Sequence, residues 1–380
     1  MEHRAVHTFP FTAMLAQESL RDLQQSPVTT YENWVHQETI SRCIAGIIII
    51  AAALGSVSKE QSFSPPILEA KFPLPSNNTE WLKDKQGWGG PPETHYSSAC
   101  LASILAGRQP AMKLTEFSFV TIISAILCRI CSFEALAGSH HKDLYSSFVR
   151  KMDKSLQVAD RMLRDYIKTL VLGSTPTPLI HCAVTLLNSS FYHLYASPQL
   201  GNMKKLLLRP SILDDYGEGD SIFSHDYSPW LEKALLRAAE ALRADSRLGL
   251  KYMKKVAPHR FAPLSATSCC EGGLLLCWYL QTKNSLLMNP ESQEVLERLL
   301  SEGVAEMDGV RMSSEDHHAA LPLAACADLV GEGSVWKCKI IPSSNLKEWP
   351  CAVSSKLTGL IARLKLMNTA SVLPPPHELL

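Results

Sequence analysis

The chain has 380 residues, 46% of them hydrophobic, so it is long enough to bury a large core. Its 37 basic and 37 acidic residues cancel. A surface that binds nucleic acid usually carries a basic excess, so this balance argues against direct binding of DNA or RNA. The 11 scattered cysteines suggest reduced thiols in a cytosolic or nuclear protein. The N-terminal segment lacks an uninterrupted apolar core, so we expect no signal peptide.

Residues 1–60 are expected to form an N-terminal arm that carries one apolar helix. The pattern predicts this helix over Ser41–Leu54, although the β-branched run Ile47–Ile50 leaves a strand as an alternative. Residues 61–98 are rich in proline and glycine, which predicts a connector with little regular structure. We expect this connector to divide the arm from the main body.

The stretch from Leu114 to Leu136 is nearly all apolar and carries only three charged residues. It is too long for a buried strand, so it predicts a helix buried on most of its surface. The other amphipathic segments then have to pack around it. The sequence therefore predicts an all-α fold, a multi-helix bundle around a central buried helix at about 114–136.

Further helices are predicted along the rest of the chain. From His140, apolar residues recur three and four apart as far as Leu170, which indicates an amphipathic helix. A mostly buried helix follows from Leu179 and is expected to end at Ser197-Pro198. Ser228 and Asn289, each followed by proline, are expected to begin two more. The predicted domain of residues 99–370 then holds helices near 230–245, 265–281, 290–307, 314–329 and 352–366, with a short strand or nothing at Lys337–Ile341 and a tail at 371–380.

Two motifs resemble sites with known chemistry. Cys128-x-x-Cys131 has the spacing of a zinc knuckle or redox pair, but no second pair lies at a suitable distance, which favours core packing. Asp214, Asp215 and Glu218 resemble the magnesium signature of terpene cyclases. That use requires a helix, and the glycines beside them favour a solvated turn.

Other polar clusters have ordinary explanations. His140-His141 and His317-His318 each lie at an expected helix start, and dispersed basic residues usually form solvated faces. No phosphate-binding loop, nucleophile elbow or HExxH motif is present in the sequence. We therefore expect no enzyme, and predict no catalytic residue, cofactor or metal ligand. The basic clusters are Lys204, Lys205 and Arg209, and Lys251, Lys254, Lys255, His259 and Arg260.

Membrane association is a further alternative. Ile44–Val57 is shorter than the roughly 20 residues that cross a bilayer, and Arg129 interrupts the longer stretch that includes Phe117–Ile130. We expect no membrane insertion.

The order of segments resembles the regulatory, or middle homology, domain of fungal-specific transcription factors. The likeness covers about residues 95–300. Leu114–Leu136 is similar to the central buried helix of that family and Leu144–Tyr166 to its next, amphipathic helix. Pro178–Leu200 is similar to a third helix that ends before a loop, through Leu186-Leu187, Phe191-Tyr192-His193-Leu194 and Ser197-Pro198.

One feature of that family is missing from the sequence. Its members carry an N-terminal zinc cluster or paired zinc fingers, whereas residues 1–100 hold only Cys43 and Cys100. The resemblance implies a nuclear transcription regulator, of secondary-metabolite or similar pathway genes, that lacks its own zinc finger or derives from a truncated gene model. It implies protein partners from the transcription machinery, a small effector as a further option, and DNA reached only indirectly or through a missing N-terminal module. The remaining alternatives are a terpene-cyclase-type enzyme and a membrane-associated protein.

Overall fold

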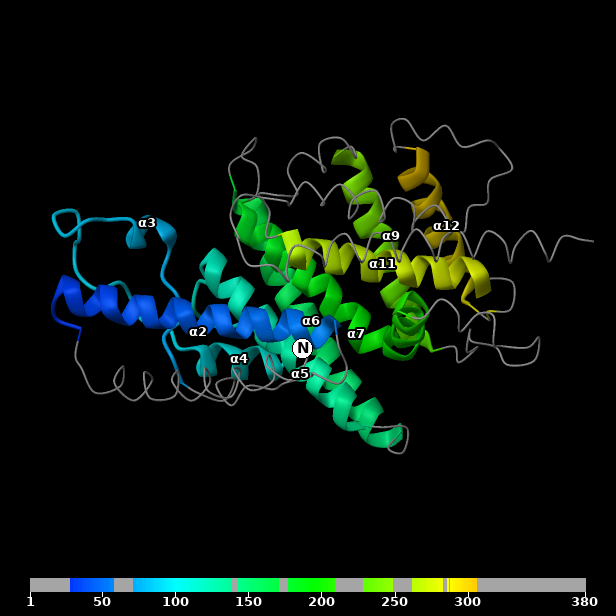
Figure 1. Cartoon of the computed structure of the whole chain (residues 1–380), viewed down its shortest axis with the longest axis horizontal. Helices are drawn as coiled ribbons and strands as arrows, with labels where there is room; N and C mark the ends of the chain where they lie inside the picture. Colours follow the sequence, from blue (N-terminus) through cyan, green and yellow to red (C-terminus); the bar gives the residue numbers. More distant parts are fainter. Residues whose placement is uncertain are drawn as a thin grey trace, which may run out of the picture. The chain divides into compact units, whose positions relative to one another are not determined.

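The computed structural model describes residues 28–57, 71–137, 142–170, 177–208, 228–248, 262–282, 286 and 288–305. Within these ranges the chain forms nine helices, and its only β-type pairing is an isolated bridge between Pro73 and Tyr96. The predicted all-α fold class is confirmed (Figure 1). The chain divides into two compact units, Met1–Leu194 and Tyr195–Leu380, which are described separately.

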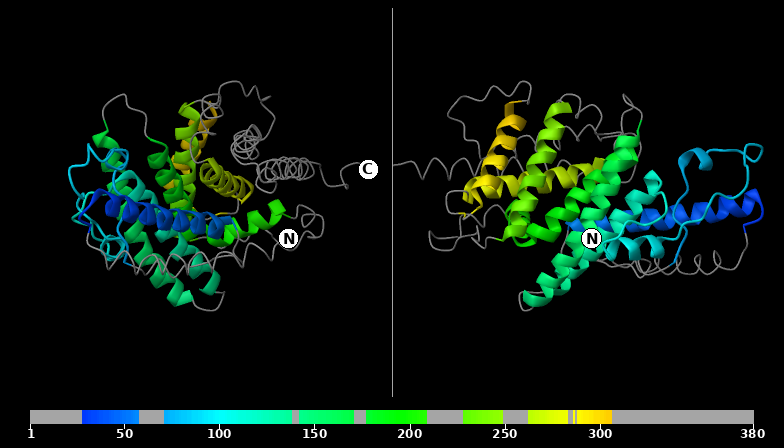
Figure 2. Two further views of the ribbon diagram at one scale, coloured as in Figure 1. Left: turned by 60° about the vertical axis from the view of Figure 1, so that its left-hand side comes forward. Right: turned by 180° about the vertical axis from the view of Figure 1, so that it is seen from behind.

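The first unit is built on two apolar helices that pack together, α2 and α5. Helix α2 packs more extensively against α5 than against any other helix of the described ranges. Helix α6 contacts both α4 and α5, and these helices are the cyan to green segments in the two views of Figure 2. The bounds are Tyr31–Val57 for α2, Asn78–Trp81 for α3, Ser97–Leu105 for α4, Glu116–Ala137 for α5, Lys142–Thr169 for α6 and Pro178–Leu208 for α7.

Helix α5 is the predicted central helix, and its burial is confirmed. Ile122, Ile123, Ile126 and Leu127 are each at most 2% exposed. Three hydroxyl side chains, those of Ser118, Thr121 and Ser124, are buried in the same helix. Burial on several sides explains why the sequence of this helix shows almost no polar face.

Helix α2 begins ten residues before the predicted start at Ser41. The hydroxyl oxygen of Thr30 accepts a hydrogen bond from the backbone N–H of Asn33 at 3.2 Å, which satisfies a donor of the first turn. Trp34, in that turn, is 5% exposed and belongs to the core. The alternative of a strand at Ile47–Ile50 is wrong, because α2 runs through this segment without interruption.

Helix α6 is amphipathic, as its sequence predicts. Met152, Leu156, Ala159 and Leu163 are buried, whereas the basic residues that alternate with them are exposed. The apolar stripe faces the unit, and the opposite face meets solvent.

Helix α7 is interrupted directly beside Ser197-Pro198, where its sequence predicts an end. It bends at Ala196, where φ is −130° and ψ is 26°, and continues with Pro198 inside it. Proline has no N–H to give to the carbonyl four residues earlier, here that of Leu194. The hydroxyl of Tyr145 on α6 donates to that carbonyl instead, at 3.2 Å. The acceptor released by the proline is therefore satisfied within the first unit, and the helix kinks where it was expected to stop.

The second unit contains the end of α7 together with α9 (Pro229–Leu248), α11 (Ala262–Thr282) and α12 (Pro290–Ala305). Helix α9 packs against both α11 and α12, the yellow to orange helices in Figure 2. Both predicted caps are confirmed, because the side chain of Ser228 accepts from Trp230 N–H at 3.2 Å and that of Asn289 from Glu291 N–H at 3.1 Å.

Several predicted elements lie outside the described residues. They are the helices at 314–329 and 352–366, the strand at Lys337–Ile341 and the tail at 371–380. The predicted boundaries at residues 60 and 98 stay a prediction. The division between the two units falls inside the segment 99–370, which the sequence suggests as one domain.

Candidate functional site

Most of the polar clusters that the sequence singles out lie outside the described residues. The idea of a magnesium site at Asp214, Asp215 and Glu218, and with it the enzyme alternative, therefore stays a prediction. The same holds for His140 and His141, for His317 and His318, for Arg209, and for the basic group Lys251, Lys254, Lys255, His259 and Arg260.

Lys204 is within the described residues and forms an ion pair in the second unit. Its Nζ lies 2.6 Å from Oε1 of Glu271, a side chain that is 1% exposed, whereas that of Lys204 is 20% exposed. A buried carboxylate requires a partner of opposite charge. Lys204 thus compensates Glu271, while its neighbour Lys205 is exposed.

Two helices are long and apolar enough to cross a membrane by length and composition alone. They are Tyr31–Ser56 in α2 and Glu116–Glu134 in α5. Half of the most apolar window of the first and 72% of that of the second are buried inside the protein, as in the core helices of soluble proteins. The alternative of membrane association stays a prediction.

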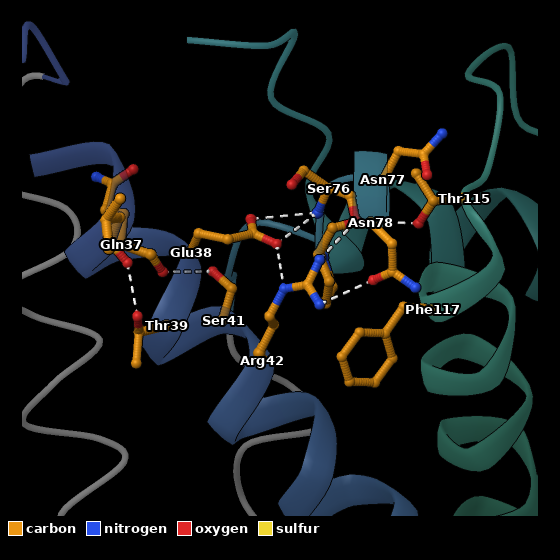
Figure 3. Close-up of polar contacts among 12 residues, drawn as sticks. Gln37, Glu38, Thr39, Ser41, Arg42, Ser76, Asn77, Asn78, Thr115 and Phe117 are labelled. Carbon is orange, nitrogen blue, oxygen red and sulfur yellow. Dashed lines mark hydrogen bonds and ion pairs between the residues drawn. The ribbon is translucent and has the colours of Figure 1, made fainter. Parts of the chain in front are cut away.

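A polar cluster joins α2 to the connector that follows it, and we call its members Glu38, Arg42, Ser76 and Asn78 the Arg42 clamp. Nε of Arg42 donates to Oε1 of Glu38 at 2.7 Å, and its two other nitrogens donate to Asn78 Oδ1 at 3.0 Å and to the Ser76 carbonyl at 3.1 Å. The Ser76 N–H donates back to Glu38 at 2.9 Å. Figure 3 shows the guanidinium of Arg42 reaching from α2 to the backbone of Ser76 and the side chain of Asn78.

Aromatic rings complete the surroundings of the Arg42 guanidinium. Its central carbon lies 4.8 Å from the ring centre of Trp81 and 5.3 Å from that of Phe117 on α5. Cations over aromatic faces are stabilised in this way. Each of the three guanidinium nitrogens donates one hydrogen bond within the clamp, which holds the connector against α2 and α5.

The two cysteines of the C-x-x-C motif are both buried in α5, at 2% exposure each. The Cys128 thiol lies 3.8 Å from the Ile48 carbonyl of α2, to which it donates a weak hydrogen bond. Burial raises the pKa of Cys128 well above its ordinary value, with a smaller contribution from Cys131. Cys128 is therefore a protonated core residue at neutral pH.

Cys131 belongs to a different group, with Glu134 one turn further along α5 and His193 on α7. We call these three residues the buried cluster. Nδ1 of His193 lies 3.0 Å from Oε2 of Glu134, and the two side chains are 4% and 5% exposed. One potential ligand atom from each of the three residues lies within 4.8 Å of the others. A thiol, a carboxylate and an imidazole thus meet in the interior of the first unit.

One hydrogen-bond acceptor of the buried cluster has no donor. Oε1 of Glu134 is buried and has no hydrogen-bond partner. Burial raises the pKa of Tyr145 to about 12, and the charge of Glu134 contributes to the rise. On the α2 side, a Cβ added to Gly55 would lie 3.4 Å from the Cβ of Cys131, so the backbone of α2 approaches closely. The cluster is bordered by residues of α2, α5, α6 and α7, and one of the two oxygens of its carboxylate has no hydrogen-bond partner.

Only part of this cluster could be found in the sequence. Cys131 and Glu134 are three apart, a spacing that places two side chains on one face of a helix. His193 is 59 residues further along the chain than Glu134, so a search for short metal-binding motifs does not connect it with the other two residues. Comparison with models of known protein families, with curated proteins and with solved structures finds no match to this chain. A function for it must therefore be argued from its own residues.

Proposed function

We propose that this chain is a nuclear, all-helical transcription regulator that acts through contacts with protein partners of the transcription machinery or with a small effector. It would reach DNA indirectly and regulate the genes of a fungal pathway, such as one for a secondary metabolite. The regulatory domain that its sequence resembles has a central buried helix, then an amphipathic helix, then a third mostly buried helix. The observation that carries the proposal is that α5, α6 and the first part of α7 follow in this order within one compact unit.

The exposed face of α6 supports a role in partner binding. Five basic residues on this helix are spaced four, seven, three and four apart, so they form a single stripe along it. All five are exposed, and we call them the basic stripe: Arg150, Lys154, Arg161, Arg164 and Lys168. Among the described side chains of α6, two of the five have an ion-pair partner, since Arg164 pairs with Asp160 and Lys168 with Asp165.

The basic stripe suits an acidic protein segment. Complementary charge across an interface speeds association and excludes partners of the same sign. The chain as a whole has no net charge, so the stripe is a local feature and differs from the broad basic surface of a nucleic-acid-binding protein. Acidic segments of other regulatory proteins are the partners that fit this face.

A tethering experiment tests the proposal. The full chain is fused to a heterologous DNA-binding domain, and a reporter gene carries that domain's site. We expect the fusion to activate or to repress the reporter relative to the DNA-binding domain alone. A fusion with Ile126→Asp in the core of α5 should lose the effect.

Charge reversal on α6 then examines the basic stripe. The double variant Lys154→Glu, Arg161→Glu should weaken the effect at equal protein level. Lys151→Glu is the matched control, since Lys151 is exposed on the same helix but lies about a quarter turn from the stripe. A wild-type fusion that neither activates nor represses the reporter contradicts the proposed function. If Lys151→Glu is as harmful as the double variant, the stripe is not the partner surface.

A further inference from the structure

We infer that the buried cluster of Cys131, Glu134 and His193 is a binding site for one divalent cation of the zinc type. The inference is independent of the proposed function. It rests on the kinds of donor atom that meet in the cluster, on their distances and burial, and on the unused oxygen of Glu134.

The three donor atoms suit zinc better than other common divalent cations. Zinc binds thiolate sulfur, imidazole nitrogen and carboxylate oxygen, usually with four ligands in a tetrahedron. Calcium and magnesium prefer sets made of oxygen only. A mixed sulfur, nitrogen and oxygen set therefore selects against them.

The charges of such a complex would cancel. A thiolate from Cys131 and the carboxylate of Glu134 contribute two negative charges, and neutral His193 contributes none. A divalent cation balances them, so the bound site carries no net charge in a region where the side chains of Glu134 and His193 are 5% and 4% exposed. Charges buried this deeply are costly when they are not paired.

The geometry requires little movement. The three ligand atoms already lie within 4.8 Å of one another. A cation placed among them with bonds of about 2.0–2.3 Å would separate Nδ1 of His193 from Oε2 of Glu134 by slightly more than the present 3.0 Å. Cys131 and Glu134 are held one turn apart on α5, so rotation of the three side chains brings their ligand atoms to bonding distance without a change in that helix.

A simple ion pair between His193 and Glu134 leaves part of the cluster unexplained. The pair uses Oε2 of the carboxylate, whereas Oε1 is buried without a hydrogen-bond partner. A buried acceptor without a partner costs free energy. In a metal complex the cation lies beside the carboxylate, so Oε1 also gains a partner of opposite charge, and Cys131, Glu134 and His193 supply three of the four ligands.

Cobalt substitution gives a direct test on the reduced full-length chain. The purified protein is stripped with a chelator and titrated with Co²⁺, whose bond to a thiolate produces charge-transfer absorption in the near ultraviolet. We expect this absorption to saturate at one Co²⁺ per chain, tetrahedral d–d bands to appear in the visible, and Zn²⁺ to abolish both. Zn²⁺ at a hundredfold excess over its dissociation constant should also raise the unfolding midpoint by about 5 °C.

Matched variants assign the absorption to the cluster. Cys131→Ser should remove the charge-transfer band, whereas Cys128→Ser, one turn away in the same buried helix, should keep it. His193→Asn should weaken Co²⁺ binding by more than about 100-fold, because even indirect partners of metal ligands change affinity by about 10–100-fold. Circular dichroism of each variant establishes that the helices remain.

Two results overturn the inference. Absence of any thiolate–cobalt band in the wild-type chain means that the cluster is a hydrogen-bonded pair of Glu134 and His193 beside a thiol, and no metal site. A band that survives Cys131→Ser but is lost in Cys43→Ser, a variant at an exposed cysteine, means that the metal binds at the surface.

Discussion

The Nε atom of Arg42 lies 2.7 Å from Oε1 of Glu38, one turn earlier on α2, where the Glu38 side chain is 6% exposed. This ion pair is the centre of the Arg42 clamp, which also holds Ser76 and Asn78 of the connector. Glu38 and Arg42 are thereby held beside Ser76 and Asn78, which lie 34 to 40 positions later in the chain. The connector is bound to α2 along this stretch.

Removal of the guanidinium should destabilise the first unit strongly. Arg42→Met leaves the buried carboxylate of Glu38 without its cation and removes two hydrogen bonds to the connector. Loss of one partner of a buried ion pair typically costs about 3–5 kcal/mol, so we expect a decrease of about 3 kcal/mol in the free energy of unfolding. Urea denaturation followed by circular dichroism measures it.

The chain offers a matched control for this prediction. Arg164 and Asp160 on α6 have the same spacing and the same 2.7 Å distance, but the side chain of Arg164 is 58% exposed. Surface pairs of this kind contribute about 0.3–0.5 kcal/mol, so Arg164→Met should cost no more than that. An equal decrease in the free energy of unfolding in the two variants would show that burial of the clamp does not contribute to stability.

Two glycines should respond to alanine with opposite signs. Gly107 follows α4 with φ of 72°; its N–H donates to the Ile104 carbonyl at 2.8 Å, and the Arg108 N–H donates to that of Ser103 at 3.0 Å. This pattern is a Schellman cap, which requires the left-handed region. Gly107→Ala should therefore destabilise the protein by about 1 kcal/mol.

Gly46 lies inside α2, and a Cβ added there would meet no atom within 4 Å. Alanine is favoured over glycine in a helix by about 0.8–1.0 kcal/mol, so Gly46→Ala should raise the unfolding midpoint. Thermal denaturation of the two variants, side by side, checks both signs. A stabilising Gly107→Ala would contradict the cap described for α4.

Buried thiols should make the protein sensitive to alkali. Burial raises the pKa of Cys100 from an ordinary value of 9.0 to about 12, and that of Cys182 likewise. Between pH 9 and about pH 12 the thiol is protonated in the folded state and ionised in the unfolded state. The contribution of the protonated thiol to the free energy of unfolding is therefore complete below pH 9 and disappears as the pH rises to about 12. For each such thiol, the free energy of unfolding should fall by up to about 1.4 kcal/mol per pH unit in this range.

Urea denaturation between about pH 8 and about pH 11 measures this loss. In Cys100→Ala the fall of stability with pH should be less steep than in the wild type. The control is Cys43→Ala at an exposed position, which should leave the slope unchanged. An identical slope in all three proteins would show that Cys100 ionises equally easily in the folded and unfolded states.

The parts of the fold that depend on local pattern could be predicted from the sequence. The apolar run of α5 and the repeating apolar residues of α6 mark their helices, and Ser228 and Asn289 mark two helix starts. Periodicity and caps are properties of a few neighbouring residues, so no knowledge of tertiary contacts is needed.

Features that depend on distant partners could not be predicted. Pro198 suggests a helix end, but the hydroxyl of Tyr145, 49 residues before Leu194, satisfies the carbonyl that the proline leaves. The pair Glu38 and Arg42 has the spacing of an ordinary surface ion pair, and it is the connector and Phe117 of α5 that cover it. For the buried cluster, the decisive residue His193 comes from another helix.

The direct test of a transcription regulator is a measurement of transcripts in the organism that produces it. RNA levels are compared between cells with the chain, cells without it, and cells in which the wild type or Ile126→Asp is restored. We predict that a limited set of transcripts changes on removal and recovers with the wild type, but does not recover with the variant. If no transcript depends on the chain, or the core variant restores every level, the proposed function is contradicted.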